Sequence, residues 1–199
     1  MITTDRLLSA QDDLQAEAEE VSAALGLAAL LGEIGDPVRV GSAALGLMVR
    51  RDLDVTVVCR KLDAATTTAV AQAGAQLAVR QDVQEVRFRD DTGHWNTDPK
   101  YPDGLYLGVR HRTSRHHDWT LDIWFVDEPE RQPDLAHLAS LPPRLTADAR
   151  VAILLIKQAL AGGAGGPSPV PSYEVYRAVL DDGVRGVDEF EKWLATQHG

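Results

Sequence analysis

A Gly-Ser pair followed ten residues later by two alternate aspartates constrains this chain more than any other feature. A short β-branched run leads into Gly41 and Ser42, and a short helical stretch then leads to Asp52, Leu53 and Asp54 at the start of an apolar run. Side chains alternate faces along a strand, so Asp52 and Asp54 are expected on one face while Leu53 points into a core. Two carboxylates this close repel each other unless a cation lies between them. The pattern therefore predicts a metal site.

Composition narrows the class of protein. The chain has 199 residues, of which 44% are hydrophobic and 25% charged, and a net charge of −10. This charge argues against a protein that holds nucleic acid nonspecifically, because such binding needs a basic surface. The net charge does not exclude a nucleotide ligand, which a local positive pocket can bind. We expect a cytoplasmic protein, because we find no signal peptide and no apolar run of the ~20 residues that a membrane span needs.

Hydrophobic periodicity and turn residues predict a mixed αβ chain. A core over residues 1–128 is expected to hold a mixed β-sheet flanked by helices, and residues 129–199 are expected to form an all-helical C-terminal lobe. The fold class is therefore α+β. Gly26 is expected to interrupt the first helix, Thr4 to cap it, and Asp63 and Ser172 to cap later helices. Strands are predicted over 38–40, 54–59, 83–88, 105–109 and 120–126, with a long loop over 90–103 and a linker over 162–169.

A third carboxylate lies in a later apolar strand. Asp122 is the lone acid in the segment from Trp119 to Val126. A charge inside an apolar strand needs a metal or an ionic partner. A buried ion pair with an arginine is the alternative to a metal. Mg²⁺ sites are built from carboxylate oxygens and substrate phosphates, so Asp122 is the best candidate to complete the predicted site.

In this order, these residues resemble the DNA polymerase beta-like nucleotidyltransferase superfamily. Its hallmark is Gly-Ser, a short helix, Asp-x-Asp entering a strand, and a third Asp on a later strand. Residues 36–126 carry the resemblance, with Gly41 and Ser42 followed by the three aspartates. Arg51 departs from the pattern, since many members have a small polar residue before the first Asp. The size and the compact helical lobe fit a small-molecule acceptor, as in the antibiotic-modifying branch of this superfamily, better than a long nucleic acid.

The resemblance implies a role for each matching residue. Gly41 and Ser42 would hold the triphosphate at a helix start, where backbone N–H groups favour anions. Asp52 and Asp54 would hold one Mg²⁺ or Mn²⁺, and with Asp122 a second one that activates the acceptor hydroxyl. The implied reaction is transfer of a nucleoside monophosphate, most simply AMP from ATP, to a hydroxyl or phosphate of a small molecule. Nucleic acid is not the expected acceptor, and no membrane partner is expected.

Lys157 is a further nucleotide-binding candidate. It lies in an otherwise apolar helical segment, and related transferases bring a lysine from the helical lobe to the triphosphate. The alternative is a lysine that extends along the helix end into solvent.

Other polar and aromatic groups leave several roles open. The basic segment 110–117 can neutralise phosphate or an acidic acceptor, or can simply form an exposed hairpin tip. Large aromatics can stack on a base or sugar, although they more often belong to a core. These aromatics are Trp95, Tyr101, Tyr106 and Trp124, and the candidates for a general base are His117, Asp118, Asp127 and Glu128.

Two alternatives compete with the transferase. The segment from Asp52 to Thr56 also matches the nucleophile motif of haloacid-dehalogenase-like phosphatases, but there the apolar strand precedes the acids, whereas here it follows them. A non-catalytic nucleotidyltransferase-like module that binds nucleotide or protein is the second alternative. A module without catalytic activity would gain nothing from keeping three carboxylates that repel one another.

Overall fold

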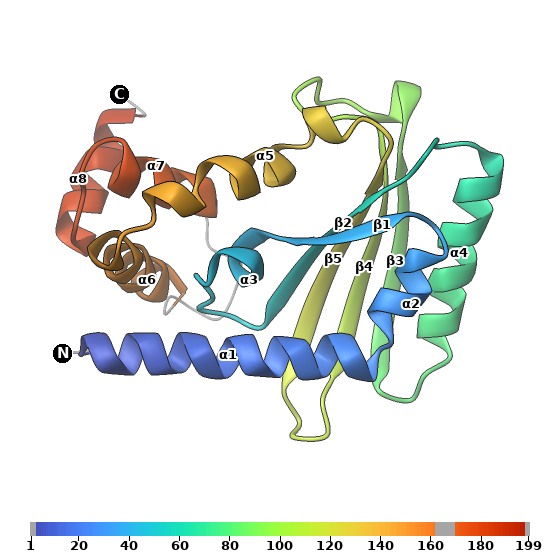
Figure 1. Cartoon of the computed structure of the whole chain (residues 1–199), viewed down its shortest axis with the longest axis horizontal. Helices are drawn as coiled ribbons and strands as arrows, with labels where there is room; N and C mark the ends of the chain where they lie inside the picture. The colour runs from blue at the N-terminus through green and yellow to red at the C-terminus, as the bar shows by residue number, and fades with distance from the viewer. Residues whose placement is uncertain (1–2, 162–169, 198–199) are drawn as a thin grey trace.

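A five-stranded sheet forms the centre of the molecule (Figure 1). The computed structural model describes residues 3–161 and 170–197. The strand order is β1-β2-β5-β4-β3, and only the β2–β5 pair is parallel. The strands are β1 (Asp36–Val40), β2 (Asp52–Val58), β3 (Val83–Asp91), β4 (Gly104–Arg112) and β5 (Asp118–Val126).

Three helices cover one face of this sheet. They are α1 (Thr4–Ala24), α2 (Leu27–Gly32) and α4 (Ala64–Ala78), and α1 runs across the lower ends of β4 and β5 in Figure 1. Alternate strand residues point toward them and are buried, as the period of two requires. The buried strand side chains of this core include Leu53, Val57, Leu107, Leu121 and Ile123. The opposite face carries the polar residues of the same strands.

Local chemistry explains where the helices begin and end. Gly26 takes a left-handed conformation (φ 64°) between α1 and α2, so the predicted interruption is confirmed. Asp63 caps α4 as predicted, since its carboxylate accepts hydrogen bonds from the backbone N–H groups of Ala65 and Thr66. The predicted cap at Thr4 is wrong by one residue, because Thr3 occupies that position and its side chain makes no capping bond.

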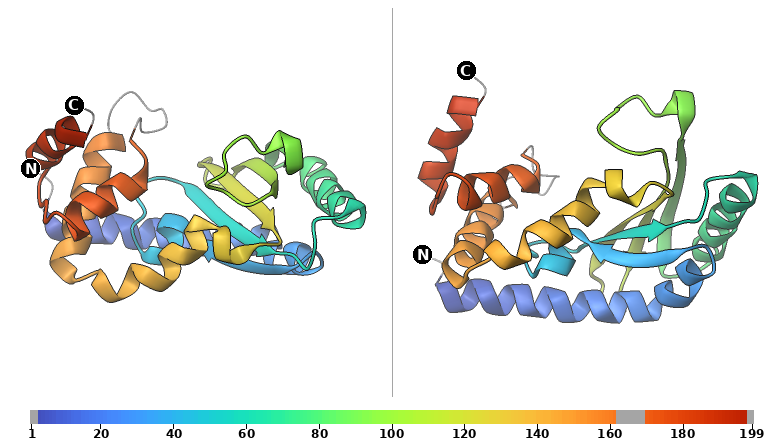
Figure 2. Two further views of the ribbon diagram at one scale, coloured as in Figure 1. Left: turned by 90° about the horizontal axis from the view of Figure 1, so that it is seen from above. Right: turned by 45° about the horizontal axis from the view of Figure 1, so that its top comes forward.

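A helical lobe lies at one end of the sheet (Figures 1 and 2). Its main helices pack around a second hydrophobic cluster that also takes in Leu45 and Leu47 from the segment before β2. The predicted cap at Ser172 is wrong: Ser172 is the first helical residue, and Pro171 occupies the cap. The predicted linker over 162–169 lies outside the described residues. The lobe contains α5 (Pro133–Ser140), α6 (Ala147–Ala161), α7 (Ser172–Leu180) and α8 (Val187–Gln197), with short 3₁₀ turns at Pro129–Arg131 and Pro142–Arg144.

The long loop between β3 and β4 is held by specific bonds. It contains a 3₁₀ turn, Gly93–Trp95. Asp103 accepts hydrogen bonds from the backbone N–H of Gly93 and from Asn96, at 2.9 and 3.1 Å. Arg131 donates to backbone carbonyls of the loop from the start of the helical lobe. The loop therefore has a defined position beside the sheet.

The mixed sheet flanked by helices confirms the predicted α+β fold class. The helices predicted after residue 129 are present within the described ranges. Across residues 3–161 and 170–197, no helix is long and apolar enough to span a membrane.

Candidate active site

The three predicted aspartates lie on one face of two neighbouring strands. In the parallel pair of β2 and β5, Asp54 is directly opposite Asp122. Asp52 lies two residues before Asp54 and therefore on the same face. Their neighbours Leu53 and Leu121 point to the other face and are buried in the core. The fold thus brings together acids that are 68 positions apart in sequence.

Gly41 lets the turn after β1 lie directly against Asp54. Its φ is +63°, a conformation that side chains disfavour, and a Cβ there would overlap a carboxylate oxygen of Asp54. The last residue of β1, Val40, pairs with Asp54 in the antiparallel ladder, which fixes this approach. Gly41 then opens the short helix α3 (Gly41–Leu45). The Gly-Ser turn and the aspartates therefore form one site.

Lys157 reaches this turn from the helical lobe. Its Nζ donates to the Ser42 hydroxyl at 2.6 Å and to the Leu47 carbonyl at 2.8 Å, with the Tyr176 hydroxyl at 3.4 Å. The side chain is 7% exposed, so it does not extend into solvent. The turn and the ammonium group are therefore neighbours.

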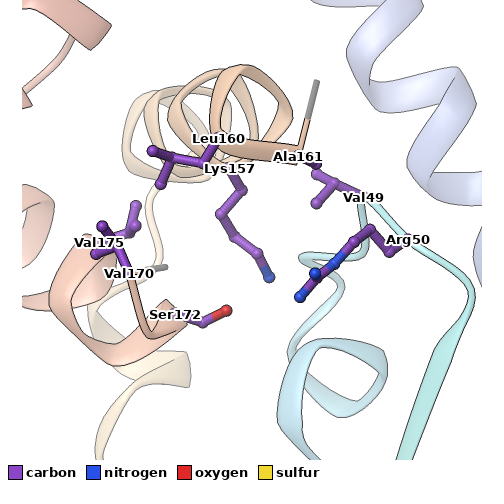
Figure 3. A pocket seen from close by; sticks show the side chains of 8 residues that line it. All are labelled: Val49, Arg50, Lys157, Leu160, Ala161, Val170, Ser172 and Val175. Carbon is purple, nitrogen blue, oxygen red and sulfur yellow. The ribbon is translucent and has the colours of Figure 1, made fainter. Parts of the chain in front are cut away.

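Arg50, Lys157 and Ser172 point into a common pocket (Figure 3). They come from the segment before β2, from α6 and from the start of α7. Arg50 also lies 3.9 Å from a carboxylate oxygen of Asp52, so the pocket adjoins the aspartates. Two cations and a hydroxyl suit an anion such as phosphate. Sequence reasoning missed Arg50 and Ser172 as pocket residues, because an arginine before a strand and a serine at a helix start are common without any ligand.

The electrostatics of the aspartates reflect their burial and their proximity. Burial raises the pKa of Asp54 to about 8, and the charges of Asp52, Asp122 and Asp134 add to this effect. Burial also raises the pKa of Asp52, which the charges of Lys157 and Arg50 partly oppose. These carboxylates are therefore costly to ionise together without a counter-charge.

Asp134 is a fourth acid that sequence reasoning did not identify. It lies in the first turn of α5, a helix that contacts β1 and α3. Burial raises its pKa, and its charge in turn raises that of Asp54. Acids are common in the first turn of a helix, because they interact favourably with the helix dipole. The position of Asp134 in the sequence therefore did not indicate a functional site.

The donor chemistry of the site fits a hard divalent cation. Asp52, Asp54 and Asp122 offer carboxylate oxygens, the ligands that Mg²⁺ prefers, and a bound cation would relieve their repulsion. Across the described residues, however, no group of three or more His, Cys, Asp or Glu side chains is arranged to hold a metal ion. Asp122 instead accepts a hydrogen bond from the Tyr106 hydroxyl. Burial and this bond raise the pKa of Tyr106.

The residues considered as general bases are engaged in other contacts. His117 and Asp118 belong to the hairpin between β4 and β5, and the other two follow β5. The pairs are Asp118 with Arg112, Asp127 with the backbone N–H of Leu62, Glu128 with Arg131, and His117 with Glu17.

The described fold is similar to solved structures of RNA-modifying transferases. One is a cytoplasmic RNA terminal U-transferase, with a TM-score of 0.53 over 88% of this chain and 54% of that one. Another is Cid1, described as an RNA terminal uridylyl transferase, with a TM-score of 0.55 over 85% of this chain and 47% of that one. A third is the Cid1 poly(U) polymerase bound to MgGTP, with a TM-score of 0.55 over 89% and 56%.

Sequence identity to each of these structures is 18%, so the likeness concerns the fold. The chain spans about half the length of these proteins. No protein-family model and no curated protein matches the sequence. The similarity to these solved structures shows that the chain has a nucleotidyltransferase-like fold.

Proposed function

We propose that this protein is a Mg²⁺-dependent nucleotidyltransferase that moves a nucleoside monophosphate, most simply AMP from ATP, onto a hydroxyl or phosphate of a small-molecule acceptor. One observation carries the proposal. The Gly-Ser turn lies against Asp54, on the same face as Asp52 and Asp122, and Lys157 donates to the serine of that turn. Anion-binding and cation-binding groups are thus side by side, as a metal–triphosphate substrate requires.

Each residue has a distinct part in this proposal. Lys157, Arg50 and the Ser42 and Ser172 hydroxyls bind and orient the triphosphate from the pocket side. Asp52 and Asp54, together with Asp122, would hold divalent cations, which supply charge neutralisation and lower the pKa of the acceptor hydroxyl. The acceptor oxygen attacks the α-phosphorus in line and pyrophosphate leaves. Positioning and electrostatic stabilisation account for the catalysis.

A small acceptor is favoured by charge. The chain carries a net charge of −10, which disfavours long nucleic acid. A haloacid-dehalogenase-like phosphatase is not supported, because β2 pairs antiparallel with β1 in a nucleotidyltransferase-like sheet.

Thermal unfolding with ATP, GTP, CTP and UTP, each with and without Mg²⁺, tests the donor site. Ligand at 100 times its dissociation constant stabilises by about 2.7 kcal/mol. For a chain of this size, that raises the midpoint temperature by roughly 5–10 °C. We expect a Mg²⁺-dependent rise with at least one triphosphate in the wild type, and none with Asp54→Asn. No rise with any triphosphate would refute the proposal.

A further inference from the structure

An aromatic and basic platform lies beside the three aspartates on the open face of the sheet. We define it as Arg87, Arg89, Tyr106 and Trp124. Strand register places Arg87, Gly108, Asp122 and Asp54 in one row across four strands. The next row contains Arg89, Tyr106 and Trp124. The platform therefore continues the row of acids toward the β3 edge, away from α5.

Two glycines of β4 give the aromatic rings their positions. A Cβ on Gly108 would lie 2.6 Å from the Tyr106 hydroxyl, and one on Gly104 would lie 3.1 Å from the Trp124 ring. The two rings lie 5.1 Å apart, and the Arg89 guanidinium lies over both, at 4.8 and 5.4 Å. The Tyr106 hydroxyl donates to Asp122, so the platform is bonded directly to the candidate active site.

The platform carries one uncompensated positive charge. Asp91 pairs with Arg89, with nitrogen–oxygen distances of 2.7–2.9 Å. Arg110, in the row on the other side, faces Glu85 at 3.7 Å. Arg87 is exposed, and among the described residues it forms no hydrogen bond or ion pair. A guanidinium that is free for a ligand therefore lies in line with Asp122.

We propose that this platform binds the acceptor, and that the acceptor is a small anion that carries a ring, such as a nucleoside monophosphate. This inference rests on the proposed function, because it assigns the second substrate of the same site. The rings of Tyr106 and Trp124, with the Arg89 guanidinium over them, offer a surface on which a planar group can stack. The guanidinium of Arg87 binds the phosphate, for which its planar fork of donors is suited.

Reach and charge both agree with this class of acceptor. Arg87 and Asp122 are two strands apart, roughly 10 Å at the usual strand spacing. A side chain as long as arginine can span part of this gap, so the anionic group and the reacting hydroxyl of a single nucleotide fit between them. A polycationic acceptor such as an aminoglycoside would meet the uncompensated charge of Arg87 with like charge, which disfavours it.

Isothermal titration of two matched probes tests the inference. Adenosine 5′-monophosphate and adenosine differ only by the phosphate, and the cationic aminoglycoside kanamycin is the third probe. The donor site is first saturated with Mg²⁺ and α,β-methylene-ATP, so that the monophosphate cannot occupy it. We compare the wild type with Arg87→Gln and Arg87→Lys, and with Arg6→Gln on α1 as a control for the loss of an exposed arginine.

We expect the monophosphate to bind wild type about tenfold more tightly than adenosine, and Arg87→Gln to remove that difference. Arg87→Lys should retain part of it, and Arg6→Gln should retain all of it. Equal binding of the two probes, no binding, preferential binding of kanamycin, or an unchanged affinity in Arg87→Gln would each overturn the inference. If the wild type fails to bind α,β-methylene-ATP, the proposed function fails instead. The Arg87 comparison, repeated without the analogue, then still decides whether the platform binds this anion.

Discussion

At the scale of single residues, Gly41 is constrained both by its backbone conformation and by its close approach to Asp54. Gly26 has almost the same backbone, with φ values of +64° and +63° at the two positions, but a Cβ on Gly26 would meet nothing within 4 Å. Substitutions at Gly26 and Gly41 therefore separate the cost of backbone strain from the cost of contact with Asp54.

Gly41→Ala should cost much more stability than Gly26→Ala. A left-handed alanine costs roughly 1–2 kcal/mol. Gly41→Ala adds overlap with Asp54, for which overpacking typically adds about 1–3 kcal/mol. Urea denaturation of both variants measures the difference. Equal losses in the two variants would mean that the turn does not lie against the carboxylate.

Asp54 should make the protein less stable as the pH rises. Its pKa is raised from 3.8 to about 8, so between these values the folded state binds more protons than the unfolded state. The free energy of unfolding therefore falls as the pH rises. The total loss is about 1.4 kcal/mol for each unit by which folding raises the pKa.

Asp54→Asn removes this titration. In EDTA at pH 8 the variant should unfold at a higher urea concentration than wild type, and at pH 4 the difference should vanish. Asp13→Asn, an exposed acid on α1, serves as the control. A variant less stable than wild type at pH 8 would contradict the burial of an uncompensated carboxylate.

At the scale of elements, hydrophobic pattern and turn chemistry predict much of the chain. The alternation in 83–88 and the apolar run after Asp54 both lie in strands. However, β2 begins at Asp52 and β3 extends to Asp91, because pairing with neighbouring strands extends a ladder beyond its apolar part. Strand partners cannot be derived from the local pattern, so the sequence did not predict the parallel pair that brings Asp122 opposite Asp54.

Helix α6 should depend on Lys157 for its connection to the Gly-Ser turn. Lys157→Met keeps most of the side-chain volume but leaves the Leu47 carbonyl and Ser42 without the ammonium donor. Losing a buried hydrogen-bond partner costs about 1–3 kcal/mol. Mg²⁺–ATP affinity should fall as well, as calorimetry can measure. Lys192→Met on α8, an exposed lysine, should change neither quantity. Full ATP affinity in Lys157→Met would exclude the lysine from the donor site.

Helix α1 should be secured to the sheet by Glu17. This buried carboxylate lies 2.7 Å from Nδ1 of His117 in the β4–β5 hairpin and 3.1 Å from Nε of Arg51, next to Asp52. Burial alone would raise its pKa, but the bonds with His117 and Arg51 outweigh that and lower it. The stabilisation is therefore complete above the ordinary value of 4.5 and is lost as the pH falls below it.

Glu17→Gln should lower the free energy of unfolding at pH 7 by about 1.5–3 kcal/mol, the range for hydrogen bonds to charged groups. The loss should shrink as the pH falls below 4.5. Asp13→Asn, at an exposed position of the same helix, is the control. A loss that is independent of pH would point to packing rather than to the carboxylate.

At the scale of the whole molecule, the site lies where the sheet, the Gly-Ser turn and the helical lobe meet. The sequence identifies the residues with strong chemical character, namely the aspartates, the Gly-Ser pair and Lys157. It does not identify Arg50, Ser172, Asp134 or Arg87, because each is of a type that surfaces and helix starts commonly carry. Only the arrangement of strands and lobe makes these residues neighbours of the site.

Following both ends of the triphosphate is the most direct test of the central claim. ATP labelled at the α- or the γ-phosphorus is incubated with protein, Mg²⁺ and a deproteinised small-molecule extract that supplies acceptors. We expect γ label to leave as pyrophosphate and α label to enter a new small molecule, with neither event in Asp122→Asn. Release of γ label as inorganic phosphate, or persistence of all label in ATP that the protein demonstrably binds, would contradict nucleotidyl transfer at this site.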